Sequence, residues 1–188
     1  MSEEISQSTV PTLPLAINWQ YVRDLSFEVP AGAEIFISLR TPPQISINID
    51  VQTSRLPNKH AEDNGQMTYE VVLSIKTEAK EVSEPTENPE TNDKETNDKK
   101  VDRVVFIAEL VYAAVVTLNN PPPEMVEPIL LVEVPRLIFP YARNIISEIT
   151  SNGGFPPVVM QPIDFVALWQ SRVNQASPTA TTDQVGHA

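Results

Sequence analysis

Cysteine is absent from the 188 residues of this chain. Disulfides, thiolate-ligated metals and thiol nucleophiles are therefore excluded. Glycine is scarce at 5 residues while proline is abundant at 18, so we expect stiff or extended connections. No apolar run approaches the roughly 18 residues of a membrane span, and the first residues lack the basic and apolar parts of a secretory leader. These absences predict a soluble, cytoplasmic protein with no direct membrane insertion.

Positive charge is also in short supply. The formal net charge is −12 and the sequence pI is about 4.5. Such a chain is repelled by nucleic acid and by anionic lipid, and it favours partners with basic patches. The sequence contains no H-E-x-x-H, no G-x-S-x-G and no phosphate-cradling glycine loop. We therefore predict no enzyme activity, no cofactor, no metal and no nucleic-acid partner.

Four segments alternate in the way that is typical of half-buried strands. They cover residues 17–29, QISINIDV (44–51), TYEVVLSIKTEA (68–79) and RVVFIAELVYAAVVTL (103–118). In the first segment, Asp24 and Glu28 belong to the alternate positions that are mostly polar. The positions between them are apolar, with Arg23 as the one exception. These apolar positions are Ile17, Trp19, Tyr21, Leu25, Phe27 and Val29. The fourth segment is apolar on both parities, which is typical of a central strand covered on both faces. In a chain of this size the second cover can come from another subunit.

Three segments are too polar to fold. Residues 1–13 and 176–188 are predicted to be disordered tails. Between the third and fourth strands, residues 80–100 repeat the unit TNDK and carry seven acidic residues against four lysines. We expect this stretch to be a disordered acidic loop insertion within a single domain at 14–175.

Helical periodicity follows the strands. The prolines after Asn120 predict an extended, apolar crossover, which either covers the core or walls a groove for an extended apolar peptide. The stretch LIFPYARNIISEIT, residues 137–150, reads as an amphipathic helix ended by Gly153 and Gly154. A second helix is expected from the N-cap Asp164. Strands followed by helices predict an α+β fold, with a four-stranded antiparallel sheet and two C-terminal helices packed on one face.

Several motifs together resemble the SecB family of bacterial protein-export chaperones. The block L-x-F-P-Y-A-R lies at 137–143, G-x-F-P at 153–156 and P-[IV]-[ND]-F-x-A-L at 162–168. VRDLSFEVP, YEVVL and FIAEL resemble strand elements of the same family. The matches extend from about residue 15 to residue 172. The TNDK insertion is a departure, as is RTPPQ, where many members carry a tryptophan.

The resemblance implies an ATP-independent holdase that keeps precursor proteins unfolded and delivers them to the export motor SecA. It also implies a homotetramer, a dimer of dimers, with the interface at Tyr141, Ile145 and Ile149. By motif match, the SecA-binding residues are Asp24, Glu28, Ile107 and Glu109. For the client-binding groove we select apolar residues near the motifs: Leu39, Ile45, Ile47, Phe165, Leu168 and Trp169.

Other functions remain open at this point. The same fold can serve another client, such as a toxin–antitoxin partner. An acidic adaptor for a folded basic protein is an alternative from a different class, and it predicts no preference for unfolded chains. An enzyme ranks below both, because no nucleophile–base set or metal set is visible.

Overall fold

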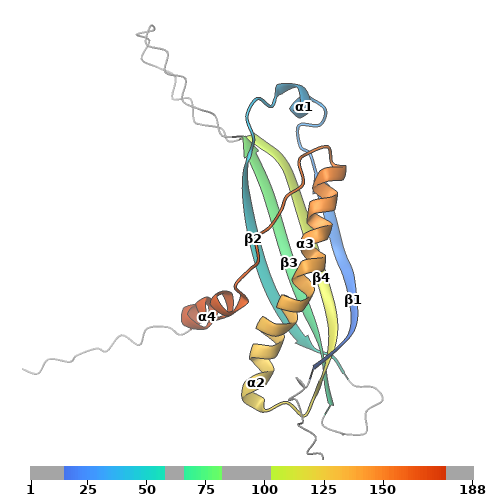
Figure 1. The fold of residues 1–188 in the computed structure, drawn as a ribbon, viewed down its shortest axis with the longest axis vertical. Coiled ribbons are helices and arrows are strands. Elements are labelled where there is room, and N and C mark those ends of the chain that lie inside the picture. The colour runs from blue at the N-terminus through green and yellow to red at the C-terminus, as the bar shows by residue number, and fades with distance from the viewer. Residues whose placement is uncertain (1–14, 58–65, 82–102, 177–188) are drawn as a thin grey trace, which may run out of the picture.

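The computed structural model describes residues 15–57, 66–81 and 103–176. Four long strands form one antiparallel sheet in the order β1-β4-β3-β2 (Figure 1). They are β1 Leu15–Glu28, β2 Gln44–Arg55, β3 Gln66–Glu81 and β4 Arg103–Asn119. The predicted α+β class and antiparallel sheet are confirmed. The predicted tail at 1–13 lies outside the described residues. Of the tail predicted at 176–188, Ala176 is helical and the remainder is not described. Residues 82–100 of the predicted insertion are not described either, and its first two residues belong to β3.

The predicted extended crossover is wrong, because this segment is helical. Helix α2 Pro123–Pro128, a π-helical turn η1 Ile129–Glu133 and helix α3 Val134–Asn152 follow one another without a break. Pro123 stands at the start of α2, where a missing N–H costs nothing. The π turn, which is wider than an α-helical turn, lies between Pro128 and Pro135. Its residues Ile129, Leu130 and Val132 are buried. Burial of this apolar stripe outweighs the proline penalty.

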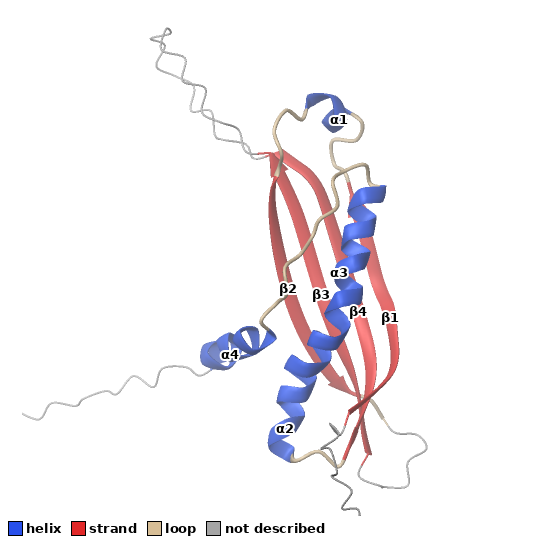
Figure 2. Cartoon of the chain, viewed as in Figure 1, coloured by secondary structure: helices blue, strands red, loops and turns tan. Residues whose placement is uncertain are grey.

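Helix α3 runs along one face of the sheet (Figure 2). Its buried stripe faces the sheet and contains Ile138, Phe139, Ala142 and Ile146. The helix ends at Gly153, as predicted, and Gly154 has a φ of 88°. A Cβ on Gly153 would lie 2.2 Å from the ring of Phe27, so the residue allows a close approach of helix end and strand β1.

The predicted parity of β1 is wrong at Trp19 and Tyr21. Register shifts occur between Ile17 and Trp19 and between Val22 and Asp24. Each bulge reverses the side-chain alternation, so Trp19 and Tyr21 lie on the opposite side of the sheet from Ile17. The second bulge restores the alternation, and Phe27 again faces the core, where it stacks on Phe106.

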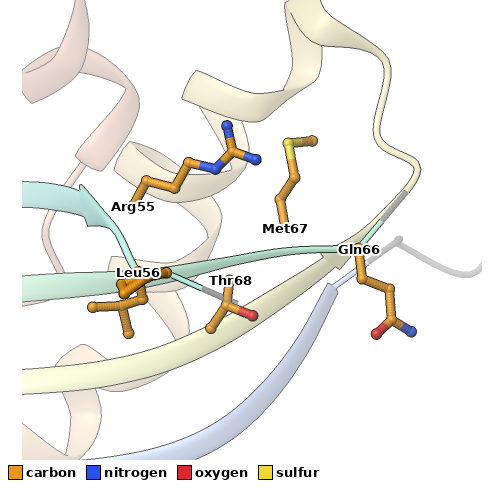
Figure 3. A pocket seen from close by; sticks show the side chains of 6 residues that line it. Arg55, Leu56, Gln66, Met67 and Thr68 are labelled. Carbon is orange, nitrogen blue, oxygen red and sulfur yellow. The ribbon is translucent and has the colours of Figure 1, made fainter. Parts of the chain in front are cut away.

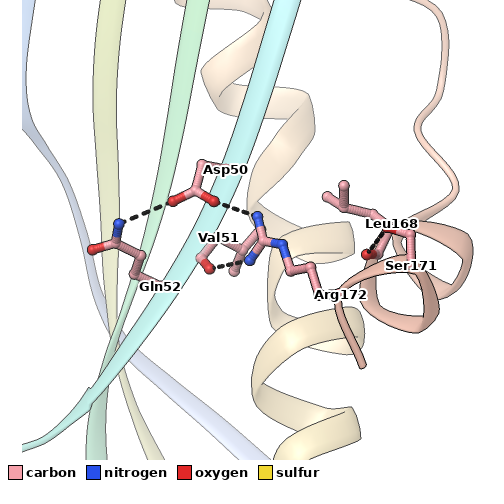
Figure 4. A network of polar contacts seen from close by, with 6 residues as sticks. All are labelled: Asp50, Val51, Gln52, Leu168, Ser171 and Arg172. Atoms are coloured by element: carbon pink, nitrogen blue, oxygen red, sulfur yellow. Dashed lines mark hydrogen bonds and ion pairs between the residues drawn. The ribbon is translucent and has the colours of Figure 1, made fainter. Parts of the chain in front are cut away.

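Helix α4 Phe165–Ala176 begins where the sequence predicted. Asp164 Oδ1 accepts a hydrogen bond from the backbone N–H of Ala167 at 3.0 Å, which is an N-cap contact. The predicted packing of α4 on the sheet is wrong, because the helix lies beside the edge strand β2 (Figures 1 and 4). There Arg172 donates to the backbone carbonyl of Val51 at 2.6 Å and pairs with the carboxylate of Asp50. The arginine thereby caps part of an exposed sheet edge.

Candidate functional site

One side of the sheet carries α3 and the other side, which we call the open face, carries no element of the described chain. The ladder pairs Glu28 with Ile107 and Ser26 with Glu109, and Asp24 sits opposite Val111. These pairs place all four predicted partner-binding residues on the open face and near one end of it. Strand β3 adds an acid that the motif match missed, because Glu78 pairs with Ile107.

The acids of the open face have few basic neighbours. Lys76 Nζ lies 2.5 Å from Glu109 Oε1, and both side chains are about half exposed. The hydrogen bond to Glu109 is the main cause that raises the pKa of Lys76, and charges on Glu78 and Glu28 contribute. Further along the face, Glu70 pairs with Arg23 at 3.5 Å. Glu70 also accepts a hydrogen bond from Tyr21 Oη, which raises the pKa of that tyrosine.

An apolar pocket of about 570 Å³ lies on the opposite side, where the α3 side of the sheet meets the edge strand β2. Two of the predicted groove residues, Ile47 and Leu168, line it together. Asn48 and Ile49 of β2 also line it, and the rest of the wall comes from the chain between α3 and α4. The residues that it contributes are Val159, Met160, Gln161 and Ile163. Residues 159–161 were not singled out from the sequence, since their role depends on an extended path that no periodicity reveals.

The chain between α3 and α4 is held extended by two side chains of α3. Thr150 Oγ1 accepts a hydrogen bond from the N–H of Val158 at 3.0 Å. Arg143 donates to the carbonyl of Met160 at 3.4 Å. Val158 and Met160 are consequently buried, while Val159 between them is 71% exposed. An extended chain alternates its side chains, so anchoring two residues presents the third to the pocket.

The other predicted groove residues fall in different environments. Phe165 is 1% exposed and packs edge-on against Phe139, with ring centroids 5.8 Å apart, so the prediction of an open groove position is wrong for this residue. Leu39 is partly buried against the core beside α1 Glu34–Ser38. Ile45 is exposed on the same side of β2 as Ile47. Trp169 lines a separate pocket beside α2 and η1, where its indole N–H donates to Glu127 at 3.1 Å.

The predicted oligomer-interface residues differ in their exposure. Tyr141 is exposed on the outer side of α3, together with Leu137, which the sequence analysis did not select. Ile145 and Ile149 are partly buried against the core. An outward-facing Leu–Tyr pair one helical turn apart is an apolar surface that a neighbouring helix can cover.

A further pocket lies at the end of the β2–β3 hairpin. Arg55, Met67 and Thr68 are among its lining residues (Figure 3). It contains none of the predicted site residues. No helix in the described part of the chain is long and apolar enough to cross a membrane.

The sheet thus presents two exposed surfaces of different chemistry on its opposite sides, an apolar pocket and an acidic face. The family model described as preprotein translocase subunit SecB matches residues 7–176. The chain therefore belongs to the SecB family of protein-export chaperones, which are not enzymes.

Similar proteins agree with this family. The chain is 58% identical to protein-export protein SecB 1 of Gluconobacter oxydans, over 93% of this chain and 91% of the relative. It is 62% identical to protein-export protein SecB of Gluconacetobacter diazotrophicus, over 89% and 88%. A solved Mycobacterium tuberculosis SecB-like chaperone, bound to an antitoxin peptide, shares 10% identity with a TM-score of 0.46, over 79% of this chain and 90% of that one. That last similarity is too low to bear on fold or function.

Proposed function

We propose that this chaperone holds unfolded precursor segments in the apolar pocket beside β2 and delivers them to SecA through the open face. The observation that carries the client site is the exposure of Val159 and Ile47 in one pocket, at 71% and 41%. Exposed aliphatic side chains around a concave surface offer burial to any apolar segment and favour no particular sequence. Client choice then depends on how long a precursor stays unfolded.

The pocket alone is too small to hold a long chain. Ile45 continues the exposed apolar line along β2, and Phe36 and Ile37 of α1 lie exposed beyond it. At the other end, Trp169 borders the second apolar pocket beside α2. A long unfolded segment can engage several of these places at once, so that weak contacts add through effective concentration.

The motor contact is assigned to Asp24, Glu28, Ile107 and Glu109. Their common location at one end of the open face supports this assignment, because a basic surface can meet all four simultaneously. A homotetramer built through the outer side of α3 agrees with the exposed apolar pair Leu137 and Tyr141. Such an assembly leaves the open face of each sheet available.

Light scattering of the purified protein, alone and with a precursor that cannot fold, tests the proposal. We expect a tetramer mass that takes up the unfolded precursor but not the native one, and uptake that persists in high salt. A protein indifferent to unfolded chains, or uptake abolished by moderate salt, would contradict the client site.

The motor contact is tested separately with Glu109→Lys. This variant should lose SecA binding while client uptake continues. Equal SecA binding by the variant and the parent protein would refute the assignment of the open face. The toxin–antitoxin alternative is disfavoured, because the relatives at 58% and 62% identity are protein-export proteins.

A further inference from the structure

Glu109, at the centre of the proposed motor contact, already forms an ion pair with the side chain of Lys76. Across the sheet, the ladder sets Ser26, Glu109, Lys76 and Asn48 side by side on the open face. Lys76 Nζ is 2.5 Å from the Glu109 carboxylate. A basic side chain arriving from a partner must therefore displace Lys76 or share the carboxylate with it.

We propose that Lys76 competes with the basic partner for Glu109 and so limits the affinity of the open face for that partner. This inference rests on the proposed function, in which SecA docks there. A positive charge in the middle of an acidic surface also repels an incoming positive charge. Lys76 would thereby keep the contact weak enough to be reversible, as the delivery of one client after another requires.

The surroundings of Lys76 allow the exchange to occur. A hollow of about 210 Å³ lies directly beside the ion pair, with Asp50 and Glu109 among its walls and Ser74 and Val111 lining it. An arginine or lysine side chain that enters this hollow reaches Glu109. The displaced Lys76 stays within the electrostatic influence of Glu78 and Glu28, so no charge is left without a neighbour.

The deciding experiment measures SecA affinity for Lys76→Met at two ionic strengths. Because an exposed ion pair is a weak competitor, we expect binding to tighten about two- to fivefold, and more at low salt than at high salt. Lys80→Met is the matched control. Lys80 lies on the same strand and, by the unbroken β2–β3 ladder, on the same face, and its removal changes the net charge equally, but it pairs with Glu78 at 3.1 Å instead of Glu109.

A double-mutant cycle isolates the pair. In the background Glu109→Gln the effect of Lys76→Met should shrink to that of Lys80→Met, since there is no carboxylate left to release. If Lys76→Met binds no tighter than the parent while Glu109→Gln binds more weakly, the competition is refuted and the motor site stands. If Glu109→Gln binds SecA as well as the parent, the proposed motor site itself fails.

Two checks keep the result unambiguous. Equal tightening by Lys76→Met and Lys80→Met would overturn the competition in favour of a general charge effect. Thermal unfolding of each variant, together with Lys76→Gln as a second replacement, tests for a folding defect; we expect none, because Lys76 lies at the surface of the sheet and its side chain is about half exposed.

Discussion

Val159 offers the cleanest test of the client pocket. Its side chain is 71% exposed, yet it lines the pocket and is flanked by the buried Val158 and Met160. Replacement by serine removes apolar surface that a client would cover while leaving the two anchored neighbours in place. The change therefore acts on client binding much more than on folding.

The size of the effect follows from the exposed fraction. Complete burial of a valine side chain is worth about 1.5–3 kcal/mol. A client that covers the 71% that is exposed would gain about 1–2 kcal/mol from this residue. Val159→Ser should therefore weaken binding about five- to thirtyfold for a segment that occupies one pocket.

The assay must avoid multivalency, which would hide the loss. We would measure fluorescence anisotropy with a labelled apolar peptide of about ten residues, too short to engage several pockets at once. Val22→Ser is the control, because Val22 is an exposed valine, at 44%, on β1 at the far edge of the sheet from the pocket. Equal affinities of Val159→Ser and the parent protein would refute the assignment of the pocket to clients.

Three further predictions concern the scaffold. Gly153→Ala should lower the free energy of unfolding by about 1–3 kcal/mol in a denaturant titration, because the new Cβ meets the Phe27 ring, which is fixed by Phe106 and Phe155. Arg172→Ala should speed hydrogen exchange in α4 without lowering the melting temperature much, since the lost contacts to Val51 and Asp50 are local. Burial, followed by the charge of Tyr141, raises the pKa of Tyr112 above its ordinary value of 10.0. Its contribution to stability is thus complete below that pH and is lost as the pH rises through the folded pKa, and Tyr112→Phe should flatten this loss in unfolding midpoints measured on the alkaline side.

The sequence predicted which strands form but not every face that their side chains occupy. Alternation placed Trp19 with Ile17, and the bulge between them puts the two on opposite sides. A bulge adds a single residue to one strand and does not change which residues are apolar. The sequence therefore still shows a period of two across the bulge. Asp24 and Glu28 were nevertheless placed correctly relative to each other, because both follow the second bulge.

The prediction of an extended chain between β4 and α3 was wrong for a different reason. Proline is disfavoured in helix interiors, and the prolines between Pro121 and Pro135 predicted an extended chain. Tertiary burial outweighed this local preference, since Ile129 and Val134 are both fully covered by the fold. The groove wall at Val159 had no sequence signal at all, because two residues of α3 determine its path: Thr150 accepts a hydrogen bond from the N–H of Val158, and Arg143 donates one to the carbonyl of Met160.

Alternation within β2 has a consequence for the proposed mechanism. Ile47 lines the apolar pocket, and its neighbour Asn48, which also borders that pocket at the sheet edge, pairs with Lys76 of the open face. Successive residues of one strand thus contribute to the client surface and to the motor surface, separated only by the thickness of the sheet. Neither surface covers the other, so in the proposed mechanism a bound client leaves the open face free for SecA to dock. Transfer of the client then requires that docking loosen the pocket through the strand that both surfaces share, and β2, an edge strand fastened to α4 by Arg172, is the element where such coupling would act.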